Sequence, residues 1–78
     1  MHYDDEKRLG ADLTTRIAKA AQQFYPSGIV VPDGQVAHMR NLQDFMGKLG
    51  ESKQDPLIGW YQGLPVYRSL GRDELLIF

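Results

Sequence analysis

Residues 57–68, LIGWYQGLPVYR, decide the fold because they predict a β-hairpin. Two short runs rich in apolar and aromatic residues, 57–61 and 64–68, flank Gln62-Gly63. Two-residue connections are common in hairpins, and glycine readily takes the positive φ that such turns require. Glutamine is less suited to that conformation, so the sequence leaves the type of turn open.

The two-residue turn fixes which side chains share a face of the hairpin. Side chains directly opposite each other on paired strands lie on the same face and contact one another. Proline has no N–H for a ladder hydrogen bond, so Pro65 is expected at a sheet edge or beside a β-bulge. The expected pairs are Trp60–Pro65 and Ile58–Tyr67 on one face, and Tyr61–Leu64 and Gly59–Val66 on the other.

The C-terminal residues 74–78, ELLIF, predict a third strand that follows a turn at 69–73. This strand is apolar on both faces. Such a strand is either central and covered on both sides, or an interface that a partner covers. Together with the hairpin it would form a C-terminal β-meander.

Upstream of the hairpin, residues 5–24 predict an amphipathic α-helix. Pro26 disfavours helical geometry at the preceding residue, so the helix should end near Phe24. Asp4 and Asp5 are suitable N-caps, and their charge complements the helix dipole. The apolar stripe recurs at spacings of three and four: Leu9, Leu13, Ile17, Ala20, Ala21 and Phe24.

A second helix is predicted over residues 34–49. Asp33 is the expected N-cap, and Gly50 suits the left-handed conformation that closes a helix. Between the two helices, the β-branched run 29–31 predicts a short strand. The apolar stripe of the second helix is Val36, Met39, Leu42, Met46 and Leu49, with Phe45 beside it.

These elements indicate an α+β fold in a single compact domain spanning residues 1–78. We expect two α-helices packed on one face of a small, mainly antiparallel three-stranded sheet, with 29–31 as a candidate extra strand. The segment 51–56 has no apolar residue apart from its final proline and should be a surface loop.

Composition limits the function classes. A chain of 78 residues has little room for a deep substrate cavity, which disfavours a self-contained enzyme. There is no cysteine, so neither a disulfide framework nor a thiolate zinc site can form, and a reducing compartment such as the cytoplasm is the simplest location. No apolar run is long enough for a signal peptide or a membrane span.

Catalytic and metal-binding motifs are also missing from the sequence. The only histidines are His2, beside the N-terminus, and His38, which has Asn41 and Leu42 at the i+3 and i+4 positions where a second metal ligand would lie on a helix. No glycine motif for phosphate binding is present. We therefore expect no catalytic residue, no metal and no cofactor, and interpret His38 as a surface or boundary residue.

The densest group of interface-type residues lies in the hairpin and the turn after it. Tryptophan, tyrosine and arginine bury much area and keep polar tips for hydrogen bonds, so they dominate protein interfaces. We therefore predict a non-enzymatic protein-binding module, such as an adaptor, an inhibitor or a regulatory subunit that occupies a larger protein. A phage- or plasmid-type inhibitor of a host defence complex fits this size. The expected partner-binding residues are Trp60, Tyr61, Tyr67, Arg68 and Arg72.

Two other kinds of partner are alternatives. A nucleic-acid-binding module would use the hairpin as a wing or its aromatics to stack bases, but 9 basic and 10 acidic residues, evenly mixed, supply few phosphate contacts. A second copy of the chain could pair through the C-terminal strand or the hairpin. The alternative to any of these binding roles is that the side chains of Trp60 and Tyr67 pack in the core of the protein itself.

Overall fold

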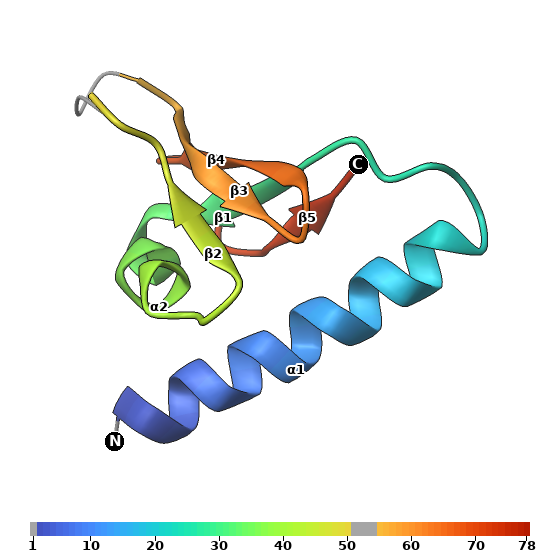
Figure 1. Ribbon diagram of the computed structural model, residues 1–78, viewed down its shortest axis with the longest axis horizontal. Helices are drawn as coiled ribbons and strands as arrows, with labels where there is room; N and C mark the ends of the chain where they lie inside the picture. The colour runs from blue at the N-terminus through green and yellow to red at the C-terminus, as the bar shows by residue number, and fades with distance from the viewer. Residues whose placement is uncertain (1, 51–54) are drawn as a thin grey trace.

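The computed structural model describes residues 2–50 and 55–78, with side chains described from Lys7 onward. One long helix precedes a mixture of short strands and short helical turns (Figure 1). In chain order, the elements are α1 (His2–Ala21), β1 (Ile29–Pro32), the 3-10 helix η1 (Asp33–Gln35), α2 (Val36–Arg40), β2 (Phe45–Gly47), β3 (Leu57–Tyr61), β4 (Leu64–Ser69) and β5 (Leu76–Ile77).

The strands form one mixed sheet of five strands in the order β2-β3-β4-β1-β5. β1 pairs parallel to β4 and antiparallel to β5, while β2, β3 and β4 pair antiparallel in succession. The α+β class is confirmed. The predicted three-stranded meander is only partly matched. Its three strands are present as β3, β4 and β5, but β1, the candidate extra strand, inserts between β4 and β5, and β2 adds a strand that the sequence did not predict.

The predicted hairpin is present with the predicted register near its turn. Trp60 pairs with Pro65, and Tyr61 pairs with Leu64. Farther from the turn, Leu57 rather than Ile58 lies opposite Tyr67, because a bulge between Leu57 and Gly59 shifts the register. β4 pairs with β1 only from Val66 onward. Pro65 is therefore not required to donate a backbone hydrogen bond to β1.

The hairpin turn is of type I′, because both of its central residues have positive φ: 51° at Gln62 and 82° at Gly63. We expect Gln62→Asn to stabilise the protein by about 0.5–1 kcal/mol, since asparagine takes this conformation more readily than glutamine. Urea unfolding followed by circular dichroism would measure the gain. A stability equal to or lower than that of the wild type would contradict the turn assignment.

The first helix is confirmed but displaced toward the N-terminus. It spans His2–Ala21, so the helix begins before the expected caps Asp4 and Asp5 and ends three residues before Phe24. A turn follows its end, in which the Phe24 N–H donates to the Ala20 carbonyl at 2.9 Å. Phe24 is 44% exposed, so the apolar stripe that contacts the core ends earlier than its periodicity suggests.

The predicted helix over residues 34–49 is wrong in most of its length. Helical structure covers only η1 and α2, and the chain then turns at residues 41–44 and enters β2. Pro32 rather than Asp33 occupies the N-cap position of η1, and no side-chain hydrogen bond is made from that position. Asparagine and aspartate at 41 and 44 favour turns over helix interiors, and the open edge of β3 offers the following residues backbone partners.

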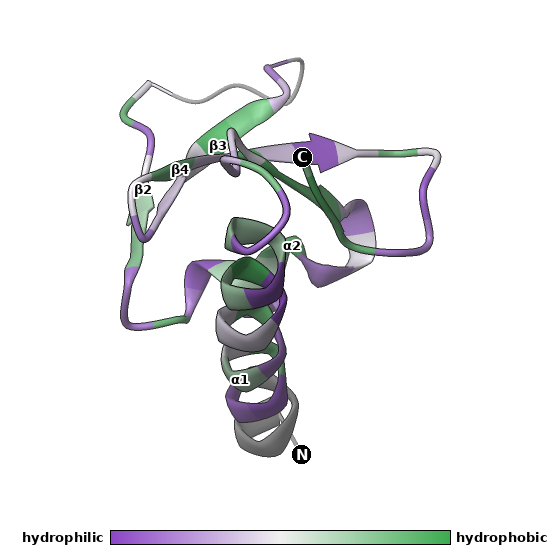
Figure 2. Cartoon of the chain, turned by 90° about the vertical axis from the view of Figure 1, so that its right-hand side faces the viewer, coloured by the Kyte–Doolittle hydropathy of each residue, from purple (hydrophilic) through white to green (hydrophobic). Residues whose placement is uncertain are grey.

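Both helices lie on the same side of the sheet (Figures 1 and 2). The core lies between these layers. From Lys7 onward, α1 contributes one fully buried side chain, Leu13, with Leu9 and Ile17 packed beside it. The buried core residues are Leu13, Ile29, Val31, Val36, Met39, Ile58, Tyr61, Val66 and Leu75. Among the described residues, no helix covers the opposite side of the sheet.

Candidate partner-binding face

The strand register defines the side chains on the uncovered side of the sheet. Ile29, Val66 and Tyr61 are buried toward the helices, so residues that alternate with them face the other way. Cross-strand pairing connects Met46 to Trp60, Trp60 to Pro65, and Val30 to both Tyr67 and Leu76. We call this surface the outer sheet face; its residues are Val30, Met46, Leu57, Trp60, Pro65, Tyr67, Leu76 and Phe78.

The outer sheet face is apolar and partly exposed. Met46 is 70% exposed, Phe78 43%, Trp60 39% and Leu76 38%. None of the eight side chains that define it carries a charge. Isolated exposed apolar residues are common on protein surfaces, whereas a contiguous group of large ones marks an interaction site.

Backbone hydrogen bonds and an aromatic contact hold the C-terminal end of this face. Phe78 and Gly28 exchange two backbone hydrogen bonds of 3.0 Å, which extend the pairing of β5 with β1 by one residue. The Phe78 ring lies over Gly28, where an added Cβ would come within 2.6 Å of it, and the Tyr67 ring centroid is 6.1 Å from that of Phe78. Only glycine at position 28 leaves room for this aromatic pair.

The structure brings together two of the five residues predicted to bind a partner. Trp60 and Tyr67 both lie on the outer sheet face. Tyr61 points to the opposite side and is 3% exposed, so its side chain belongs to the core. Arg68 is half-buried and its guanidinium donates to the Asp55 carbonyl at 3.3 Å, whereas Arg72 is exposed in the loop between β4 and β5.

Sequence reasoning did not include Met46, Leu76 and Phe78 in the site. Met46 was placed on a helix that does not form, and its true position follows only from the pairing of β2 with β3. For Leu76 and Phe78, the sequence did contain a signal, because the segment 74–78 is apolar on both faces. In the structure, Ile77 faces the helices and its neighbours Leu76 and Phe78 face outward.

A polar contact fixes the two ends of the segment that joins β2 to β3. The Lys48 ammonium pairs with the Asp55 carboxylate, which also accepts from the Leu57 N–H at 3.2 Å. The hydrogen bond from Lys48 lowers the pKa of the Asp55 carboxyl below its usual value; burial opposes this effect, and the Leu57 N–H adds to it. These contacts position the start of β3.

Because the folded-state pKa of Asp55 is depressed, its contribution to stability is present above the unfolded-state pKa and is lost as pH falls through the folded-state value. We expect Asp55→Asn to lower the melting temperature slightly at neutral pH, with a difference from the wild type that shrinks in strong acid and in about 1 M salt. Thermal melts across pH would show this. A difference that is constant from neutral to strongly acid pH would contradict it.

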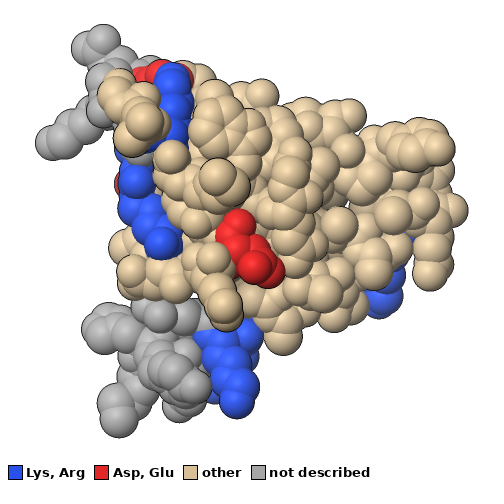
Figure 3. Space-filling view, in the orientation of Figure 1, with Lys and Arg blue, Asp and Glu red and all other residues tan. Residues whose placement is uncertain are grey.

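Among the described residues, potential metal ligands do not gather into a cluster. His38 lies half-buried on α2, and within residues 2–50 and 55–78 there is no group of three or more potential His, Cys, Asp or Glu metal ligands. The same part of the chain contains no helix with the length and apolarity needed to cross a bilayer. In the view of Figure 3, Lys and Arg side chains lie at the margins and most of the visible surface is uncharged.

A scan against protein-family models finds no match to this chain, and searches of curated proteins and of solved structures find none either.

Proposed function

We propose that this chain is a non-enzymatic protein-binding module that binds its partner through the outer sheet face. The observation that carries the proposal is the one-sided cover of the sheet: the helices pack on one face, and large apolar side chains are exposed on the other. Burial of apolar surface is the main driving force of protein association, at roughly 25 cal/mol per Å².

The face has the composition expected of an interface centre. Trp60 and Tyr67 are residue types that dominate binding energy, and Met46 is a flexible apolar group that adapts to a partner's shape. All five strands contribute to the face, so the backbone beneath it is already ordered. A partner would therefore lose little additional conformational entropy of this chain on binding.

Such a module acts by occupying a surface of a larger protein, as an adaptor, an inhibitor or a regulatory subunit. The narrower proposal, an accessory inhibitor of a host defence complex of the kind that phages and plasmids carry, draws on the small size and the lack of catalytic groups. A cytoplasmic setting suits a chain without cysteine.

The absence of charged side chains on the outer sheet face favours a protein partner over a nucleic acid. Aromatic side chains on an open sheet can stack bases, but single-stranded nucleic acid also requires cations that follow its backbone. No lysine or arginine is present among the residues of the outer sheet face, and Arg68, the nearest predicted cation, is engaged with Asp55.

The test compares the wild type with two outer-face variants, Met46→Lys and Trp60→Ala, in affinity capture from the native host. Leu70→Lys is the matched control, because Leu70 is 84% exposed and lies outside the outer sheet face. We expect one partner to be retained by the wild type and the control, and to bind each outer-face variant at least about tenfold more weakly. Circular dichroism would show that all variants are folded.

Each alternative gives its own result. Equal capture of the partner by Met46→Lys and by the wild type would exclude the outer sheet face as its binding site. Capture that nuclease abolishes and that falls steeply with salt would indicate a nucleic acid instead. Light scattering that shows a dimer, converted to a monomer by Met46→Lys, would identify a second copy as the occupant.

A further inference from the structure

A cleft on the helical side of the molecule is separate from the outer sheet face. It lies between α1, the η1–α2 segment and the loop that leads to β5, and its volume is about 780 Å³. Ligand sites for small molecules are commonly about 300–1,000 Å³ in volume. The polar residues that line the cleft are Arg8, Asp12, Arg16, Gln35, His38, Asp73 and Glu74.

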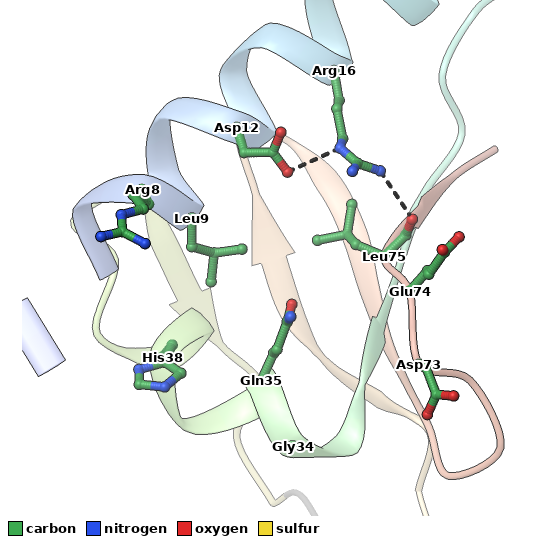
Figure 4. Close-up of a pocket in the computed structure, with 10 residues that line it drawn as sticks. All are labelled: Arg8, Leu9, Asp12, Arg16, Gly34, Gln35, His38, Asp73, Glu74 and Leu75. Atoms are coloured by element: carbon green, nitrogen blue, oxygen red, sulfur yellow. Dashed lines mark hydrogen bonds and ion pairs between the residues drawn. The ribbon is translucent and has the colours of Figure 1, made fainter. Parts of the chain in front are cut away.

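At the centre of the cleft, Gln35 has an unsatisfied acceptor. Its Oε1 atom is buried and receives no hydrogen bond from a described residue. Figure 4 shows the Gln35 amide directed between Leu9 and Leu75, which also line the cleft. A buried acceptor without a partner costs free energy, so the site favours a ligand that brings an N–H to this oxygen.

The charges of the cleft are separated along its length. Arg16 pairs with Asp12 at 2.9 Å and donates to the Leu75 carbonyl at 3.2 Å, so this pair is internally neutral and fixed to the β5 loop. Figure 4 shows Arg8 toward one end of the cleft and Asp73 and Glu74 toward the other, with Gln35 between them. The cleft therefore presents a cation at one end and two carboxylates at the other.

The geometry of α1 gives the distance between the cationic end and the carboxylate end of the cleft. Arg8 and Arg16 are eight residues apart on α1, a rise of about 12 Å at 1.5 Å per residue. Because Arg16 contacts the carbonyl of Leu75, the residue after Glu74, the carboxylate end lies near Arg16. An extended chain spans about 3.3–3.6 Å per residue, so three residues reach roughly 10 Å.

We infer that this cleft binds a short free peptide of about two to three residues in its zwitterionic form. Its ammonium group pairs with Asp73 and Glu74, its carboxylate with Arg8, and a central peptide N–H donates to Gln35 Oε1. An apolar side chain at the middle of the peptide packs between Leu9 and Leu75. The inference is independent of the proposed protein partner, since it uses none of the outer sheet face.

The experiment titrates the full chain with the tripeptide alanyl-leucyl-alanine and follows backbone amide signals by two-dimensional NMR. The same peptide with an acetylated N-terminus, and with an amidated C-terminus, provides the matched ligands. We expect saturable shifts at Leu9, Gln35 and Leu75, and an affinity that falls about tenfold with either cap. Lys19→Gln, on α1 beyond the cleft, should leave the affinity unchanged.

Two variants separate recognition from folding. Arg8→Gln should weaken the free peptide about tenfold but leave the C-terminally amidated peptide unaffected. Gln35→Leu should also weaken binding about tenfold, while the melting temperature of the ligand-free protein rises, because the unsatisfied acceptor is removed. No saturable shift with the free peptide, or an affinity for the N-acetylated or the C-amidated peptide equal to that for the free peptide, would overturn the inference.

Discussion

Gly59→Ala is expected to destabilise the protein by about 3 kcal/mol, one of the two largest effects of a single substitution that we expect. A Cβ at this position would overlap the Met46 carbonyl oxygen and would lie 2.6 Å from the Phe45 ring. The carbonyl belongs to the paired backbone of β2, so it cannot move without breaking the ladder between β2 and β3. Urea unfolding followed by circular dichroism measures the loss.

The matched control is Gly71→Ala. Gly71 is in the loop before β5, and no atom outside its chain neighbours lies within 4 Å of a Cβ built on it. The stability of the Gly71→Ala variant should therefore remain within about 0.5 kcal/mol of that of the wild type. If Gly59→Ala were as stable as Gly71→Ala, β2 would not approach β3 in the way described, and Met46 would lose its place on the outer sheet face.

Leu13→Ala is expected to cost about 3 kcal/mol, within the range of about 2–5 kcal/mol for buried leucines. Leu13 is 0% exposed and is the only fully buried side chain that α1 contributes among the described residues. A domain of this size is stable by roughly 4–12 kcal/mol, so the variant would lose a large share of that total.

The matched control for Leu13→Ala is Leu49→Ala, which removes the same side-chain atoms from a leucine that is 95% exposed. It should change the stability of the protein by less than about 0.5 kcal/mol. Thermal and urea unfolding of both variants would give the comparison. Similar losses for the two leucines would mean that α1 does not depend on Leu13 for its attachment to the sheet.

The elements that the sequence predicted well are those decided by neighbours in the chain. The hairpin at 57–68 follows from alternation on both sides of a two-residue turn, and α1 follows from a long apolar stripe. The register failed only at Ile58, where a bulge breaks strict alternation. Such an irregularity depends on how strands meet in three dimensions and leaves no simple sequence pattern.

The elements that failed depend on contacts between distant residues. Met39 and Met46 fit one helical stripe, but Met39 is in the core from α2 and Met46 is exposed on β2. What separates them is a turn at 41–44 and the pairing of Gly47 with Gly59, twelve residues later. The run at 29–31 suggested a short strand, but its position between β4 and β5 could not be inferred locally.

The candidate site shows the same division. Trp60 and Tyr67 were selected by residue type and hairpin position, and both lie on the outer sheet face. Tyr61 was selected for the same reasons and is buried, because hairpin alternation does not show which face the helices will cover. The cleft around Gln35 was not anticipated, since its walls come from three separate parts of the chain.

The insertion of β1 between two later strands has a consequence for synthesis on the ribosome. β1 ends at Pro32, but its neighbours β4 and β5 begin at Leu64 and Leu76. A nascent chain therefore carries a valine-containing strand that has no partner until β4 emerges and that keeps one open edge until β5 follows. Non-local parallel pairing is slow, and unpaired apolar strands promote aggregation, so the first half of this chain is its most aggregation-prone part before translation is complete.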